Sequence, residues 1–409
     1  MFNLLLSKEQ TELYNEAQAF VTGVDRQLLI DMDHDKIEYP REVVQTLGEL
    51  GLLGPRFPIN YGGRGLGWQE EVVLVEEIGM LGTAIGCASV MPSIVGEAIH
   101  TFGSEQQKEK YLRPTIQGEL IAAEGLTEPR GGSDFFGATT VARKEDGHWV
   151  LNGQKRFIVG AKGADYFLIY ARTSDKKDQR ENISAFLVDR DQVIVENLYE
   201  LMGTRGGGTG RVVLKDAIVK EENLVGEAGQ ASRIFYQMMI PERLTTAAAA
   251  LGLAKAALDI ALRYSKNRKA FGVPIKNFEA VSFKVAQSSA LLDAARALVH
   301  YAARAIDENA AAGVQRRLVS EAKRFSTQAA WDIINNAMQV MGGIGYTNVY
   351  PIERYLRDAR LMMIWTGTNE IMDLIVQHEL YKEAEQTRIP REVELDATGH
   401  AKTEEKVYE

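Results

Sequence analysis

The pattern of hydrophobic and polar positions changes twice along the chain, and each change predicts a new domain. Residues 1–120 carry helical periodicity and predict an N-terminal α-helical domain. Residues 121–230 contain short β-rich runs between turn dipeptides, which predict a compact antiparallel β-domain. Residues 231–382 return to long apolar periodic stretches and predict a bundle resembling four-helix bundles, while the charged residues 383–409 predict a surface tail. The predicted fold class is therefore α+β with several domains.

Local start signals place the individual helices. Capping boxes at residues 7–10 and 104–107 predict two helix starts, and further helices are expected to begin near Pro40 and Trp68. In the C-terminal part, three long helices are expected over residues 241–267, 277–309 and 314–341.

The β-domain is predicted from its short runs and turns. Strands are expected at residues 139–141, 149–151, 166–171, 184–188 and 212–214. The dipeptides Asp146-Gly147 and Asn152-Gly153 favour tight hairpins, because both types of residue tolerate a positive φ.

Bulk properties exclude several classes of function. A chain of 409 residues is too long for one small core, and its net charge of -9 argues against nucleic acid as the main partner. The single Cys87 excludes an intrachain disulfide, and the six scattered histidines form no metal motif, so no metal is expected. No apolar run approaches the roughly 18 residues of a membrane span, and no signal pattern is present. We expect a cytoplasmic protein of a bacterium or archaeon.

Four segments carry candidate chemistry. They are Gly125-Leu126-Thr127-Glu128-Pro129-Arg130-Gly131-Gly132-Ser133-Asp134, Asn152-Gly153-Gln154-Lys155-Arg156-Phe157-Ile158-Val159-Gly160, Arg268-Lys269-Ala270-Phe271-Gly272 with Asn277-Phe278-Glu279, and residues 339–370. The first is a Gly-rich loop whose backbone N–H groups can meet a flavin edge and a pyrophosphate. Taken alone, it also suits a plain Pro-Gly turn with an aspartate cap.

Together these segments resemble the signatures of the acyl-CoA dehydrogenases, from residue 5 to about 382. Members of this family oxidise acyl-CoA thioesters to 2,3-enoyl-CoA with FAD. The resemblance implies the three-domain architecture, FAD as cofactor, an acyl-CoA substrate and an electron-transfer flavoprotein as electron acceptor. It also implies a homotetramer built as a dimer of dimers, because the segment at Arg268 reaches a neighbouring subunit's FAD in the family.

The family motifs also assign site residues. By resemblance, the FAD contacts are Leu126, Thr127, Ser133, Phe157, Ile158, Val159, Arg268, Phe271, Phe278, Glu279, Gln339, Gly342, Gly343, Thr368 and Glu370. Substrate contacts are implied for Ser133, Arg243 and Gly367. The sequence departs from the pattern at Val159, which lacks the usual hydroxyl for the flavin, at Glu279 in place of a glutamine, and at Arg130 in place of a glycine.

The catalytic base is the main departure. Most members have a glutamate where this chain has Thr366, and threonine cannot deprotonate a carbon acid. A subgroup that includes isovaleryl-CoA and long-chain acyl-CoA dehydrogenases instead uses a helix glutamate, ten residues before a Gly-Leu pair. Glu242 precedes Gly252-Leu253 at this spacing. The resemblance therefore implies that Glu242 is the base, and that Thr366 retains a backbone N–H for the thioester oxygen.

The alternatives remain open at this point. Pro241-Glu242 also forms an ordinary helix start, where the helix dipole favours a glutamate. The same fold could be an oxygen-using acyl-CoA oxidase or a non-catalytic homologue that binds FAD or acyl-CoA. The helix-borne base favours a branched, aryl-substituted or otherwise bulky acyl group. Residues 86–91, expected in the acyl pocket, contain no arginine for a distal carboxylate.

Overall fold

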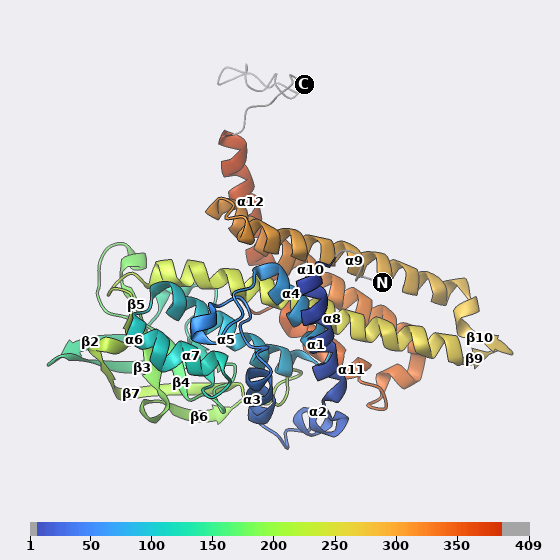
Figure 1. Ribbon diagram of the computed structural model, residues 1–409, viewed down its shortest axis with the longest axis horizontal. Coiled ribbons are helices and arrows are strands. Elements are labelled where there is room, and N and C mark those ends of the chain that lie inside the picture. The colour runs from blue at the N-terminus through green and yellow to red at the C-terminus, as the bar shows by residue number, and fades with distance from the viewer. Residues whose placement is uncertain (1–5, 387–409) are drawn as a thin grey trace, which may run out of the picture.

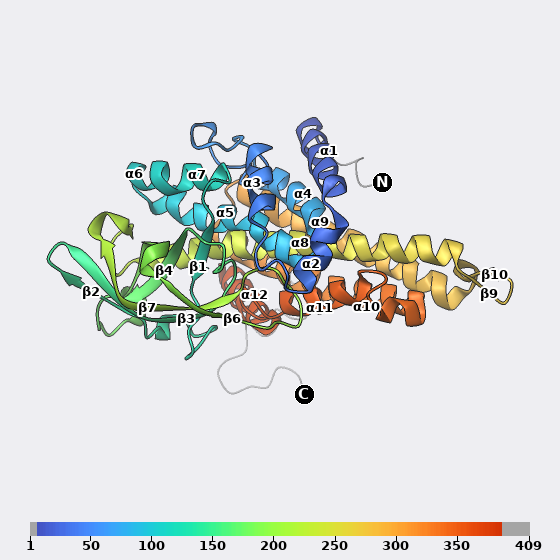
Figure 2. The same cartoon turned by 90° about the horizontal axis from the view of Figure 1, so that it is seen from below.

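The computed structural model describes residues 6–386, and it confirms the order of a helical, a β and a second helical region (Figure 1). The β-domain lies at one end of the molecule, and the long helices of the C-terminal region run from it to the other end (Figure 2). Of the predicted tail, residues 383–386 belong to the last helix, and residues 387–409 lie outside the described part of the chain.

The N-terminal region is a set of helices around an apolar core. Its α-helices are α1 (Lys8–Gly23), α2 (Arg26–Asp33), α3 (Arg41–Glu49), α4 (Trp68–Gly79), α5 (Thr83–Phe102), α6 (Glu105–Gln107) and α7 (Arg113–Ile116). Both predicted capping boxes are confirmed, since the hydroxyls of Ser7 and Ser104 each accept a backbone N–H three residues later. Helix α5 is almost completely buried, as expected from its apolar residues on all sides.

Eight strands form the sheet of the β-domain. They are β1 (Ala122–Gly125), β2 (Val141–Glu145), β3 (His148–Ile158), β4 (Tyr166–Arg172), β5 (Ile183–Asp189), β6 (Ile194–Leu198), β7 (Gly210–Lys220) and β8 (Leu224–Val225). The strand order is β6-β7-β3-β2-β4-β5-β8, with β1 paired to β4. The antiparallel prediction holds except for β1–β4 and a single β2–β4 pair, which are parallel. The residues just before β1 and β4 are already paired, since the Ile121 carbonyl accepts the Asp165 N–H at 2.8 Å. This bond aligns the start of β1 with the start of β4.

Of the two predicted hairpin turns, one is confirmed and one is wrong. Asp146-Gly147 joins β2 to β3 with φ values of 41° and 82°, as a tight hairpin requires. Asn152-Gly153 lies instead inside β3, at an irregularity in the pairing with β7. Glycine is needed there because a Cβ would lie 2.4 Å from Oγ1 of Thr140.

The C-terminal region consists of long helices and a small hairpin. Its elements are α8 (Ala231–Asn267), β9 (Lys269–Ala270), β10 (Val273–Pro274), α9 (Glu279–Asp307), α10 (Ala312–Met341), α11 (Ile352–Met362) and α12 (Asn369–Gln386). The prediction that Pro241 opens the first of these helices is wrong, because α8 begins ten residues earlier and Pro241 lies inside it. The buried neighbours Met238, Met239 and Ile240 hold this segment helical although Pro241 has no N–H to donate. Glu242 is therefore outside the reach of the dipole at the helix N-terminus.

Helix α8 is long and apolar enough, by length and composition, to cross a membrane. In the folded chain, however, 83% of its apolar window is buried inside the protein. It is the central core helix of the described residues, with contacts to α4, α5, α9 and α10.

Two glycines allow α8 to pack directly on the backbone of α4. A Cβ at Gly252 would lie 1.9 Å from the Glu76 carbonyl oxygen, and a Cβ at Gly79 would lie 2.7 Å from the Ala249 carbonyl oxygen. No side chain fits at either position. The contact fixes how far α8 is displaced along its axis relative to α4.

A buried carboxylate joins the three regions. Asp358 in α11 accepts the Thr83 N–H at the start of α5 at 3.0 Å and the Thr204 N–H of the β-domain at 2.6 Å. Each of these backbone donors belongs to a different region from Asp358 itself. The carboxylate thus holds the three regions together at one point.

Replacing Gly252 by alanine should destabilise the protein. Because the new methyl group would overlap the Glu76 carbonyl, α8 and α4 must separate, and we expect the free energy of unfolding to fall by about 3 kcal/mol. Urea unfolding followed by circular dichroism measures this change. Gly23→Ala in α1 is the matched control, since nothing lies within 4 Å of a Cβ there. Equal stability of the two variants would contradict the prediction.

Candidate active site

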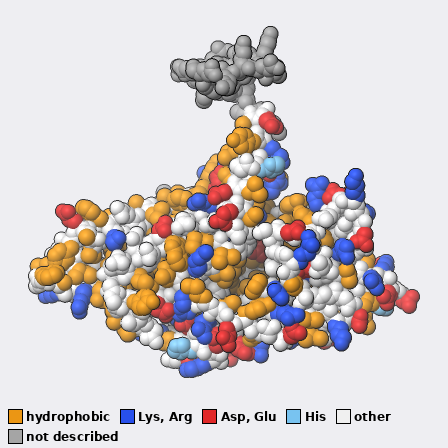
Figure 3. Space-filling view, turned by 180° about the vertical axis from the view of Figure 1, so that it is seen from behind, with side chains coloured by type: hydrophobic (Ala, Val, Ile, Leu, Met, Phe, Trp, Pro, Cys, Tyr) orange, Lys and Arg blue, Asp and Glu red, His pale blue; other side chains and the backbone are white. Residues whose placement is uncertain are grey.

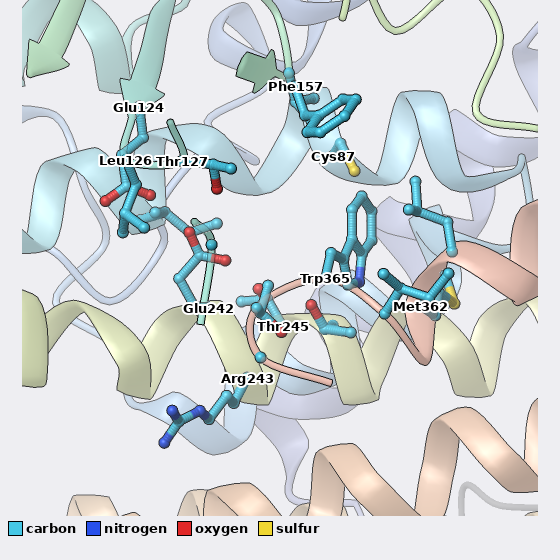
Figure 4. Close-up of a pocket in the computed structure, with 18 of the residues that line it drawn as sticks. Cys87, Glu124, Leu126, Thr127, Phe157, Glu242, Arg243, Thr245, Met362 and Trp365 are labelled. Atoms are coloured by element: carbon cyan, nitrogen blue, oxygen red, sulfur yellow. The ribbon is translucent and has the colours of Figure 1, made fainter. Parts of the chain in front are cut away.

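A cavity of about 510 Å³ lies where the β-domain meets helices α5 and α8 and the loop before α12 (Figure 4). Its wall is mainly apolar. Side chains of α5, including Met91 and Ile94, form one side, and Phe235 and Met239 of α8 form another. A cavity of this size, with few polar groups, is typical of a site for a small organic ligand.

Helix α8 places Glu242 on the cavity wall, whereas the guanidinium group of Arg243 points away from it (Figure 4). Arg243 donates to Oγ of Ser320 at 3.3 Å instead. Burial raises the pKa of Glu242 above its ordinary value. A carboxylate with a raised pKa is suited to take a proton near neutral pH.

A second carboxyl group, which belongs to none of the sequence motifs, lies in the cavity wall. Glu124 lies on β1, and its side chain points toward Glu242 (Figure 4). The two carboxyl groups lie within hydrogen-bonding reach of each other. A charged residue between the buried Ala123 and Gly125 was the available signal, because a strand in a core seldom holds an unpaired acid.

The Gly-rich loop after β1 is anchored by a buried ion pair. Lys155 donates to Oε1 of Glu128 at 2.8 Å, and both side chains are almost fully buried. Glu128 also accepts the Thr139 N–H at 2.5 Å. Burial opposes the ionisation of Glu128, but Lys155 outweighs it and lowers the pKa of Glu128 to about 2. The loop that carries Leu126 and Thr127 is therefore held rigidly against β3.

The loop from Trp365 to Thr368 closes the other side of the cavity. Thr366 has a φ of 52° and Gly367 a φ of 88°, so two successive residues adopt the left-handed conformation. Lys323 of α10, which is completely buried, donates to the Gly367 carbonyl at 2.7 Å and to Oδ1 of Asn369 at 3.1 Å. This lysine, also missed from the sequence, holds the strained loop in place.

Eleven of the predicted site residues line the cavity. They are Leu126, Thr127, Ser133, Phe157, Ile158, Val159, Glu242, Arg243, Thr366, Gly367 and Thr368. Six buried polar atoms of residues in the wall have no hydrogen-bond partner within the described chain, and they include Nε of Arg156, Nε1 of Trp365 and Oγ1 of Thr366. Such orphaned atoms suit a polar ligand that supplies the partners. The wall therefore fits a flavin.

The remaining predicted cofactor residues do not line this cavity. Arg268, Phe271, Phe278 and Glu279 surround the β9–β10 hairpin at the far end of the bundle, where Phe271 is 95% exposed. Gln339, Gly342 and Gly343 are exposed at the end of α10, and Glu370 is exposed at the start of α12. Apolar side chains gather on the surface at this far end, at the left in Figure 3.

Comparison with known proteins identifies the family. The chain matches the N-terminal domain (residues 7–119), the middle domain (residues 123–217) and the C-terminal domain (residues 233–381) of acyl-CoA dehydrogenases. It is 35% identical over 377 residues to a 3-(aryl)acrylate reductase of Clostridium sporogenes, covering 91% of this chain and 99% of the relative.

Two further relatives agree. A short-chain specific acyl-CoA dehydrogenase of Clostridium acetobutylicum is 33% identical, over 92% of this chain and 99% of the relative. A solved chain described as electron transferring flavoprotein of Acidaminococcus fermentans superimposes with a TM-score of 0.87 at 32% identity, over 92% of this chain and 98% of that one.

Fold, cavity and relatives define an FAD-dependent oxidoreductase that acts on CH–CH groups. The chain belongs to the acyl-CoA dehydrogenase family. The expected subgroup of isovaleryl-CoA and long-chain enzymes is not supported, because these relatives are named for short-chain acyl-CoA and for 3-(aryl)acrylate.

The buried Lys323 should make stability depend on pH. Burial, reinforced by the charge of Arg243, lowers the pKa of Lys323 from its ordinary value of 10.5 to about 7. Between these two values the unfolded chain binds the proton more tightly than the folded chain, so folding is favoured as the pH rises. Relative to Lys323→Met, the wild type should therefore gain up to about 1.4 kcal/mol per pH unit across this window.

Urea unfolding of both proteins at pH 7 and pH 9 measures this difference. Lys284→Met, a lysine of α9 outside the cavity, is the control and should show no such gain. A constant difference between wild type and Lys323→Met would contradict the prediction.

Proposed function

We propose that the protein oxidises an acyl-CoA thioester to the 2,3-enoyl-CoA with Glu242 as the base that removes the α-proton. The observation that carries this proposal is the placement of Glu242 in the cavity wall, together with a threonine at 366, where the family has its usual base. FAD, when bound, accepts the two electrons that leave the β-carbon with its hydrogen. The α-proton ends on a carboxylate oxygen of Glu242.

The cavity favours this proton transfer by excluding water. Met239 and Phe235 contribute apolar surface to the cavity wall that holds Glu242, and burial raises the pKa of the carboxyl group. A proton acceptor with a pKa nearer neutrality is a better match to the weakly acidic α-carbon. Arg243, the nearest cation on α8, is directed to Ser320 and leaves the Glu242 carboxylate unpaired on the cavity side.

The Trp365–Thr368 loop supplies the second part of the reaction. A backbone N–H at Thr366 would donate to the thioester oxygen and stabilise the negative charge that develops there. The threonine side chain is not needed for this role. Lys323 fixes the loop through the Gly367 carbonyl, so the donor is positioned before the substrate binds.

The FAD ring would be held by Leu126, Thr127, Phe157 and Ile158, which meet in the cavity wall. Val159 offers no hydroxyl, whereas Trp365 and Arg156 have unused donors. The exposed residues Arg268, Phe271, Phe278, Glu279, Gln339, Gly342, Gly343 and Glu370 would complete an FAD site only with another subunit. This exposure supports assembly with further copies of the chain, and we propose a homotetramer formed as a dimer of dimers. An electron-transfer flavoprotein is proposed as the acceptor on the resemblance alone.

The acyl group is proposed to be uncharged and bulky, with an aryl-substituted or branched chain. The α5 side of the cavity offers apolar groups and Cys87, and the carboxyl groups of Glu124 and Glu242 oppose a substrate with a distal carboxylate. The relative named 3-(aryl)acrylate reductase points the same way. A panel of acyl-CoA thioesters scored by bleaching of the flavin absorbance would identify the class, and peroxide release without an added acceptor would indicate an oxidase.

Glu242→Gln should abolish most of the activity. The amide cannot accept the α-proton, and we expect the rate of flavin reduction by substrate to fall by about 10³-fold. Stopped-flow absorbance under anaerobic conditions measures this rate, with retained flavin absorbance as evidence of a folded holoenzyme. Glu42→Gln on the exposed surface of α3 is the control and should keep the wild-type rate. A wild-type rate for Glu242→Gln would refute the proposed base.

A further inference from the structure

We infer that Glu124 is a positioning residue that holds a proton shared with Glu242, so that the two carboxyl groups carry one negative charge instead of two. The inference rests on the proposed function, in which Glu242 is the base. It assigns a role in the reaction to a residue outside the four segments of the sequence analysis.

The geometry places the two groups together from different domains. Glu124 lies on β1 opposite Leu168 of β4, and its carboxyl group points toward Glu242 on α8 (Figure 4). The Oε1 atom of Glu124 is buried and has no conventional donor among the described residues. The Glu124 carboxyl group lies within hydrogen-bonding reach of the Glu242 carboxyl group and of the Tyr170 hydroxyl. The Tyr170 hydroxyl donates to Sδ of Met238 at 2.9 Å, which leaves Glu242 as the partner of Glu124. Two carboxyl groups can share a hydrogen bond only when one of them holds a proton.

Electrostatics favour the same state. Two carboxylates in contact, away from water, cannot both ionise without a large energetic penalty. Burial, and then the charge of Glu242, raises the pKa of Glu124 well above its ordinary value. The hydrogen bond from Glu124 acts in the opposite direction on Glu242 and favours its charged form. Glu124 is therefore the donor and Glu242 the charged acceptor.

This arrangement prepares Glu242 for catalysis. The donated hydrogen bond fixes the orientation of the Glu242 carboxylate and leaves lone pairs free to face the substrate. When Glu242 takes the α-proton, the pair becomes neutral, so no second buried charge appears during the reaction. No bond other than the α-carbon–hydrogen bond of the substrate has to break at Glu242, and the proton on Glu124 stays in place.

Other titratable groups around the pair are neutral or already paired. Tyr170 of β4 and Cys87 of α5 are buried, and burial raises the pKa of both well above their ordinary values. Lys155 of β3 is bound to Glu128, and Arg243 of α8 is directed to Ser320. The loss of activity at low pH, which is the acid limb of the profile of rate against pH, should therefore reflect protonation of the carboxyl pair itself.

Two substitutions of Glu124 test the inference. Glu124→Leu removes the donor, so the Glu242 carboxylate loses its hydrogen bond. We expect the acid limb of the profile of flavin reduction rate against pH to move upward by about one pH unit or more. Glu124→Gln retains an N–H donor and should keep the limb within about 0.3 unit of the wild type. A residue that only filled space would be replaced better by leucine than by glutamine.

The control is the same pair of substitutions at Glu119, an exposed residue just before β1, and neither should move the limb. An unshifted limb in folded, flavin-bound Glu124→Leu overturns the inference. If Glu242→Gln is inactive while Glu124→Leu keeps the wild-type profile, the inference fails and the proposed base stands. If Glu242→Gln is active, the proposed base fails, and the inference fails with it.

Infrared spectroscopy gives a readout independent of turnover. The difference spectrum of substrate-free wild type minus Glu124→Gln at pH 7 should contain the carbonyl band of a protonated carboxylic acid. This measurement remains informative if the leucine variant does not fold. Absence of that band would show that Glu124 is ionised and would overturn the inference.

Discussion

The close contact between helices α4 and α8 is the constraint on which the position of the site depends. Gly252 and Gly79 bring the two backbones so close that no other residue fits at either position. Glu242 lies ten residues before Gly252, about 15 Å along the same helix. Because a packed helix cannot slide without breaking this contact, the glycine pair determines where the Glu242 carboxylate meets the β-domain. Stability and catalysis thus share one helix.

Local signals predicted the structure correctly where that structure depends only on neighbouring residues. The capping boxes at Ser7 and Ser104 and the turn at Asp146-Gly147 depend on neighbouring residues, and they formed as expected. Pro241 and Asn152-Gly153 carry equally strong signals, but tertiary packing overrides them. A proline interrupts only one hydrogen bond of α8, which burial of the surrounding side chains outweighs. Glycine is required at position 153 by the close approach of Thr140, thirteen residues earlier, and not by a turn.

In the candidate site too, some residues could be predicted from the sequence and others depend on tertiary contacts. The threonine at 366 and the glutamate at 242 could be related from the sequence, because a resemblance to a family carries long-range information. Glu124 and Lys323 match no motif, and their importance follows from contacts across domains. Glu124 meets Glu242 over a separation of 118 positions, and Lys323 meets Gly367 over 44. Spacing along a chain cannot reveal which buried polar group will face another.

The hydrogen bonds that Asp358 accepts from two other regions have a consequence for how the protein unfolds. Its two carboxylate oxygens each accept a backbone N–H of a different region, and the side chain is almost fully buried. A rigid-body motion of the β-domain relative to the helices would therefore break these hydrogen bonds. The β-domain and the helical regions are therefore expected to unfold together, in a single cooperative transition.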